Sequence, residues 1–186
     1  NLKVILFPNN FSKKFFLSGN FSNSSFLSNT DYVKNFSGYI SIDNDKAYIK
    51  SNSSDIEILI NTIIDKKLSF ENFKGEISVS NLITPDINIS NLKISNNQLD
   101  LSISGNINKK TDSVSIFTSL NYVDMRYATD YLPKNFITKK TSKYFSKAFL
   151  KGQTNNGHVF IDGTLSKYPF YDDYSGISYA VFPIQD

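Results

Sequence analysis

The sequence predicts a mainly β fold, in which antiparallel strands follow one another as a meander, with one short amphipathic helix near residues 139–150. Three observations predict this fold. Apolar and polar residues alternate with a period of two along most of the chain, short polar turns separate the alternating segments, and the alternation stops between Asp124 and Lys151. Alternation places the apolar side chains on one face of each strand. Since short turns join antiparallel neighbours, and antiparallel sheets tolerate a solvated face, we expect strands with one apolar face.

The alternation defines the strands in chain order. Residues 22–36 lack it and are rich in Ser and Asn, so they are predicted as a loop. Short polar turns are expected at Asp43–Asp45, Ser95–Asn97, Asn108–Lys110 and Thr154–Gly157. The strand-forming apolar residues are Ile40 and Ile42; Ile56, Ile58 and Ile60; Ile77 and Val79; Ile87 and Ile89; Leu99, Leu101 and Ile103; Val114 and Ile116; Val159 and Ile161; and Ile177, Tyr179 and Val181.

Two segments repeat a local pattern. Phe36–Ile42 resembles Phe73–Val79, because each begins with Phe, has Gly at its third position and then alternates. The spacing of such segments along the chain is irregular, so the sequence does not predict a solenoid with a fixed period.

The interruption after Asp124 predicts a helical insertion between strands, over residues 124–152. Thr138 can cap a helix from about Lys139 to Leu150, and Gly152 follows its end. The lysines of this helix form the one basic cluster, and two interpretations of it stay open: a solvated face above a sheet, or contact with an anionic membrane surface. The basic face comprises Lys139, Lys140, Lys143 and Lys147.

Composition excludes several classes of protein. The chain has 186 residues and no Cys, so it has no disulfide and no thiolate metal site. Its net charge is +3 and Arg126 is its one arginine, which does not favour nucleic-acid binding. No apolar run is long enough for a transmembrane helix, and we expect no signal peptide within these residues. Because a strand pattern begins at once at Leu2, we expect residues 1–186 to be a single β-rich segment of a larger protein.

The sequence predicts no catalytic site, metal site or cofactor. His158 has no second His or Cys with which to form a zinc site or a triad. Asp43–Asp45 lacks the further oxygens and the Gly of a calcium loop. Asp172 and Asp173 could form a hydrolase pair, but the chain has no Trp for stacking a sugar. We therefore expect a protein that is not an enzyme.

Residues 120–182 carry an ordered series of short elements. A strand at Leu120–Asp124 is followed by Tyr131–Pro133, a helix ending in Ala148–Gly152, a strand at Gly157–Leu165 and then Tyr168–Phe170. This order resembles the YhdP branch of the AsmA-like proteins of Gram-negative bacteria. Tyr168 stands where that family usually has Phe, and Tyr144-Phe145 where a Trp is usual.

The resemblance implies a curled, groove-like sheet in the style of bridge-type lipid-transfer proteins, tethered to the inner membrane by a part not present in this chain. It implies a periplasmic location and a role in phospholipid transport between inner and outer membranes. The partners are then phospholipid acyl chains, the rest of the same polypeptide and other envelope proteins, with no nucleic acid. A structural or adhesive β-sandwich without ligand is the alternative. The expected groove lining is Ile56, Ile58, Ile77, Val79, Leu99, Leu101, Ile103, Val114, Ile116, Val159, Ile161, Ile177 and Tyr179.

Overall fold

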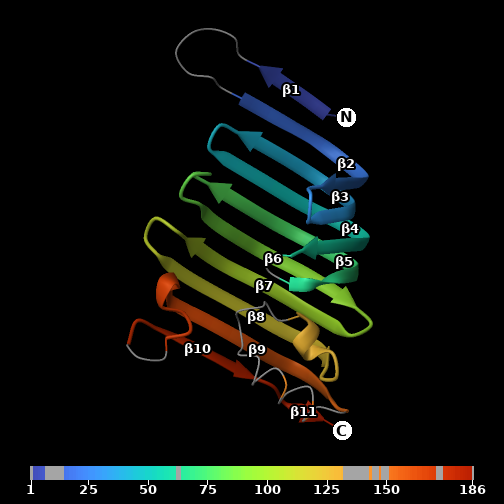
Figure 1. Ribbon diagram of the computed structural model, residues 1–186, viewed down its shortest axis with the longest axis vertical. Coiled ribbons are helices and arrows are strands. Elements are labelled where there is room, and N and C mark those ends of the chain that lie inside the picture. The colour runs from blue at the N-terminus through green and yellow to red at the C-terminus, as the bar shows by residue number, and fades with distance from the viewer. Residues whose placement is uncertain are drawn as a thin grey trace.

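A computed structural model of the chain describes residues 2–6, 15–61, 64–131, 143, 147, 151–170 and 174–185. These residues form one sheet, in which β1 to β10 are hydrogen-bonded in chain order and β11 pairs with β9 (Figure 1). All of the pairings are antiparallel. The strands are β1 (Leu2–Leu6), β2 (Phe15–Leu27), β3 (Tyr32–Asp43), β4 (Lys46–Ile60), β5 (Ile64–Ser80), β6 (Asp86–Asn96), β7 (Leu99–Asn108), β8 (Ser113–Asp124), β9 (Gln153–Thr164), β10 (Gly176–Val181) and β11 (Ile184–Gln185).

The sheet is open and is not closed into a barrel, with β1 at one end and β10 at the other (Figure 1). Its accessible surface is 12101 Å², whereas a compact protein of 21.1 kDa exposes about 9,000 Å². The excess is what a sheet exposes when the described strands provide no second sheet to cover it. The predicted mainly β meander is therefore confirmed.

Five non-glycine residues with positive φ lie within strands. Asn23 in β2, Asn35 in β3, Asp55 in β4, Asn91 in β6 and Asn156 in β9 have φ of 48°, 60°, 54°, 47° and 58°. The β2–β3, β3–β4 and β6–β7 registers shift next to Asn23, Asn35 and Asn91. Asn and Asp tolerate this left-handed conformation better than other residues with a side chain. A bulge adds one residue to a strand, bends it and increases its twist.

These bulges explain why the loop predicted at residues 22–36 is wrong. β2 continues to Leu27 and β3 begins at Tyr32, so only the short connection between them lacks strand structure. Asn23 and Asn35 are each an extra residue in their strand. Beyond each of them, the apolar side chains change from odd to even positions, or the reverse. The period of two is then lost in the sequence although the backbone remains extended and paired.

The two repeated segments lie in register on one face. Gly38 and Gly75 both pair with Ser51 of β4, and Ile40 and Ile77 both pair with Ile49. Gly75 has φ of 151°, and a Cβ on it would lie 2.6 Å from the Cα of Leu92 in β6. The repeated Gly therefore permits close approach of the neighbouring backbone. It occurs in both segments because both occupy the same position opposite β4.

The predicted turns are partly confirmed. Asn44-Asp45 and residues 109–112 form turns between strands, and the turn expected at Ser95–Asn97 lies one residue later, at Asn97-Gln98. The turn expected at Thr154–Gly157 is wrong, because these residues lie inside β9 and pair with the end of β8. Its polar Asn residues were taken for a turn, although they continue the strand; Asn156 has a positive φ of 58° while its neighbours Asn155 and Gly157 stay paired with β8.

The described ends of the segment between β8 and β9 meet, because the Met125 amide donates to the Gly152 carbonyl over 3.1 Å. The segment opens with a 3₁₀ turn, η1, at Ala128–Tyr131. The predicted helix at residues 139–150 lies outside the described residues, except for Lys143 and Lys147, which are helical and exposed. A second 3₁₀ turn, η2 (Leu165–Lys167), follows β9 and leads into Tyr168–Phe170.

The buried core is small and lies toward one lateral edge of the sheet. Tyr131 of η1 and partly buried strand residues such as Phe73 pack against it. Its members come from the bent parts of β3, β4 and β5, from β7 and β8, and from the residue after β8. They are Phe36, Ile56, Phe70, Leu99, Leu120, Val123 and Met125.

Candidate functional site: the apolar face of the sheet

Direct cross-strand pairing arranges the alternating apolar residues into rows that run across the strands. Residues directly opposite one another in antiparallel strands lie on the same face. We call this face, defined by the rows below, the apolar face. One row contains Ile40, Ile49, Ile77, Ile89, Ile116 and Ile161, with Gly105 between Ile89 and Ile116. The next contains Leu17, Ile42, Ala47, Val79, Ile87, Ile107 and Val114, and ends at Gly163.

Eight of the expected lining residues lie on this face. Ile103 pairs with Thr118, which pairs with Val159, and Leu101 pairs with Leu120. Apart from Val114, which is buried, these eight side chains are half-buried. Each half-buried side chain is shielded by its neighbours on the adjacent strands, but its outer surface stays accessible. The face therefore retains accessible apolar surface. The eight residues are Ile77, Val79, Leu101, Ile103, Val114, Ile116, Val159 and Ile161.

Three further expected lining residues lie at the buried cluster. Ile56 is 1% exposed and Leu99 is 4% exposed, and both belong to the core. Ile58 packs against that core from the bent part of β4. These three side chains therefore pack in or against the buried core at the lateral edge of the sheet, next to the apolar rows.

Ile177 and Tyr179 do not lie on the apolar face. In the β9–β10 register Ile177 pairs with Asp162 and Tyr179 with Phe160, whereas Ile161 pairs with Ser178. A shift of one residue in register exchanges the two faces of a strand, and the alternation of β10 alone does not specify which face it joins. Placing these two residues in the lining is therefore wrong.

Leu92 and Ile94 are lining residues that the alternation did not reveal. They stand at even positions, whereas Ile87 and Ile89 of the same strand stand at odd positions. The bulge at Asn91 brings both sets to one face, since Leu92 pairs with Ile103 and Ile94 with Leu101. The change of phase between Ile89 and Leu92 was the signal that could have identified them, because Asn91 itself does not differ from the many other Asn residues of the chain.

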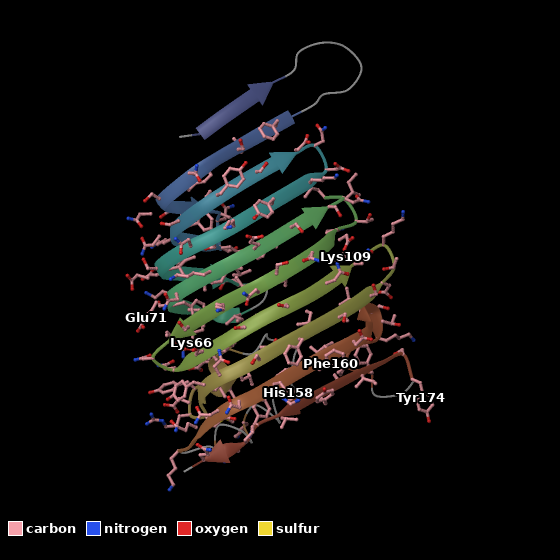
Figure 2. The ribbon with its side chains drawn as sticks, turned by 180° about the vertical axis from the view of Figure 1, so that it is seen from behind. Lys66, Glu71, Lys109, His158, Phe160 and Tyr174 are labelled. Carbon is pink, nitrogen blue, oxygen red and sulfur yellow. The ribbon has the colours of Figure 1, made fainter. Side chains whose placement is uncertain are left out.

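The opposite face, which we call the polar face, carries mostly Ser, Asn and charged side chains (Figure 2). Lys50 Nζ lies 2.9 Å from Glu76 Oε1 across β4 and β5. This contact lowers the pKa of Glu76 and raises that of Lys50, first through the hydrogen bond between them. Both groups are exposed to solvent, so the pair is a feature of a solvated surface.

At the β8–β10 end the polar face carries an aromatic group that contains His158. The His158 ring lies 6.1 Å from Phe117 and 5.7 Å from Tyr179, and Tyr179 lies 5.6 Å from Phe160 (centroid distances). His158 and Phe160 are on the polar face of β9 in Figure 2. The partners of His158 in this group are aromatic rings, so the His158 ring packs against its neighbours.

The described residues offer no grouping of three or more His, Cys, Asp or Glu side chains that could hold a metal ion. Nor does the described part of the chain contain a helix long and apolar enough to cross a membrane.

The fold and the face together define a class of protein: a single open antiparallel meander with continuous apolar rows across its strands. The chain belongs to the YhdP family, because the family model described as "YhdP protein" matches residues 11–186. Membership in this family points to a protein of the cell envelope. No curated protein and no solved structure matches the chain.

Proposed function

We propose that the chain is a hydrophobic-groove module of a periplasmic, inner-membrane-tethered protein that takes part in phospholipid transport between the inner and outer membranes. The observation that carries the proposal is the set of apolar rows that cross the strands from β2 to β9. Transfer along such a surface depends on burial of acyl chains, so the proposed activity requires no catalytic group and no cofactor.

The length of the rows suits acyl chains. Strands are about 4.8 Å apart, so the row from β2 to β9 extends over about 34 Å. The hydrocarbon core of a bilayer is about 30 Å thick for two leaflets, so an acyl chain in a fluid bilayer spans about half that distance. A row is therefore long enough to cover the whole length of one tail. Burial of apolar area contributes about 25 cal/mol per Å² and is not directional, which lets a tail slide between equivalent positions.

The alternative, a β-sandwich without ligand, requires a second sheet packed on the first. The described strands form one sheet, which favours the groove. The partners we propose are phospholipid acyl chains, the rest of the same polypeptide and other envelope proteins.

Photo-cross-linking tests the proposal at adjacent residues on opposite faces. A photoreactive side chain at Ile116 projects from the apolar face, and one at Ser115 projects from the polar face. After incubation with phospholipid vesicles, we expect lipid adducts at position 116 and at least about fivefold fewer at position 115. Mass spectrometry of the intact protein identifies the adduct. Equal labelling at both positions, or none at position 116 with the fold preserved by circular dichroism, rules the proposal out.

A further inference from the structure

A pocket of about 470 Å³ opens at the lateral edge of the sheet, beside the buried cluster. Its walls come from the bent parts of β4 and β5, the turn between β6 and β7, and η1. Figure 2 shows Lys66 and Glu71, which line it, at one lateral edge, and Lys109 at the other. The volume lies within the range of small-molecule sites.

The inner wall of the pocket is aromatic and held in place. The Tyr131 hydroxyl donates to Gln98 Oε1 over 2.8 Å and accepts from Asn96 Nδ2 over 2.9 Å. The Tyr131 ring lies 6.2 Å from the ring of Phe70, a core residue that also lines the pocket. Burial raises the pKa of Tyr131. The pocket is thus continuous with the apolar cluster on its inner side and polar on its outer side.

The outer wall carries charges of both signs. Lys67 Nζ lies 3.0 Å from Glu57 Oε1, and Lys66 pairs with Asp130 of η1. The lysine side chains are 52% and 58% exposed, so their ammonium groups retain room for a second anionic partner.

Two further carboxylates line the pocket, those of Asp55 and Glu71. They stand between the paired residues Ser54–Asn72 and Ile56–Phe70, which places the two acids opposite each other on β4 and β5. Like charges in directly opposite positions are destabilising. Neither carboxylate has an ion-pair partner among the described residues. A cationic group bound between them would remove this repulsion.

We infer that this pocket receives the zwitterionic headgroup of an aminophospholipid of the phosphoethanolamine class, an inference that rests on the proposed function. The phosphate lies against Lys66 and Lys67, and the ammonium lies between Asp55 and Glu71. The acyl chains pass along the lateral edge of the sheet to the apolar face. A glycerol headgroup gives the same phosphate contact but leaves the two carboxylates uncompensated, so the pocket selects the amine.

Competition between two lipids with the same acyl chains tests this inference in the whole chain. We expect phosphatidylethanolamine to bind about fivefold more tightly than phosphatidylglycerol, which is the upper range for solvent-exposed charge pairs. The double variant Asp55→Asn and Glu71→Gln removes both charges with little change of shape, and Asn suits the positive φ of position 55. We expect it to bind the two lipids equally. Glu76→Gln, on the polar face, is the matched control and keeps the preference.

The outcomes separate this inference from the proposed function. Equal binding of both lipids by the unaltered chain overturns the headgroup assignment and leaves the groove intact. A preference that survives in the double variant also overturns it. Glycerophosphoethanolamine, which has no acyl chains, is expected to bind at least about a hundredfold more weakly, since each tenfold is 1.4 kcal/mol and the buried tails contribute several. If it binds as tightly as the lipid, the pocket serves a soluble phosphoamine. Binding of neither lipid contradicts both proposals.

Discussion

Asp124 is a buried carboxylate at the end of β8 whose charge is stabilised by its neighbour two residues on. It accepts hydrogen bonds from the Arg126 amide over 3.1 Å and from Arg126 Nε over 2.9 Å. These contacts, chiefly the side-chain hydrogen bond, hold the pKa of Asp124 below its ordinary value. The same carboxylate precedes the point where the chain leaves the sheet, so its charge state bears on how the segment after β8 is anchored.

Replacing Arg126 with Ala should lower the free energy of unfolding by about 1–2 kcal/mol at pH 6, an amount kept small because Arg126 is half exposed. A carboxyl group with a lowered pKa stabilises the fold above its unfolded pKa of about 3.9, and this contribution is lost as pH falls through the folded pKa. The difference between variant and unaltered chain should therefore shrink at pH 3. Urea unfolding at the two pH values measures it, and an equal loss at both would falsify the assignment of the effect to the Asp124 charge.

At the scale of the element, bulges determine which side chains share a face. Asn35 in β3 has φ of 60°, and its Nδ2 donates to the Asp55 carbonyl in β4 over 2.9 Å. Asp55 is itself the positive-φ residue of β4. The two irregular positions are thus tied to each other across the strands, and together they bend the sheet where Phe36 and Ile56 become buried.

Substitutions at Asn35 separate its backbone role from its hydrogen bond. Asn35→Gly keeps access to positive φ and loses only an exposed hydrogen bond, so we expect a loss of at most about 1 kcal/mol. Asn35→Val should lower the free energy of unfolding by about 2 kcal/mol more than Asn35→Gly does, because a β-branched residue is strained in the left-handed region. Asn20→Val, at an exposed position in the regular part of β2 before the bulge, is the control and should be nearly neutral. Chemical denaturation ranks the three variants, and equal stability of the Gly and Val variants at position 35 contradicts this account.

The strands were predictable where the alternation keeps its phase. The sequence assigned Ile77 and Val79 to one face correctly, and likewise Val114 and Ile116. No bulge lies between the two residues of either pair. Prediction failed where one residue shifts the phase, as at Asn23 and Asn35, since the positive φ of an Asn leaves no distinct mark in a chain so rich in Asn.

Register was the second limit on prediction. Ile177 and Tyr179 alternate as clearly as any pair in the chain, yet they belong to the polar face, because pairing with β9 determines the side they join. The polar residues of Thr154–Gly157 have a turn-like composition but continue a strand that is held by Tyr122 and Val123 of β8. Both errors concern contacts between strands, on which the local pattern of residues carries no information.

At the scale of the whole molecule, the number of layers was the open question. An alternating strand pattern is the same in a sandwich, where another sheet covers the apolar side, and in an open sheet, where a ligand can cover it. The headgroup pocket was also beyond sequence reasoning, because its walls come from the separate segments that contain Asp55, Glu71, Gln98 and Asp130. Only the fold of the meander brings these segments to one edge.

Phospholipid bound on the open apolar face, as we propose, should stabilise the folded state of the whole molecule. A ligand that binds only the folded state at 100 times its Kd adds about 2.7 kcal/mol, and in a domain of this size each kcal/mol raises Tm by about 2–4 °C. Saturating phospholipid should therefore raise the Tm by about 5–10 °C in a thermal-unfolding scan monitored by circular dichroism. Ile103→Asp, on the apolar face, should abolish most of this rise, whereas Ser102→Asp, next to it on the polar face, should retain it. An identical rise in both variants would place the ligand elsewhere on the molecule, because a carboxylate among the apolar rows cannot be buried under an acyl chain without a cost of several kcal/mol.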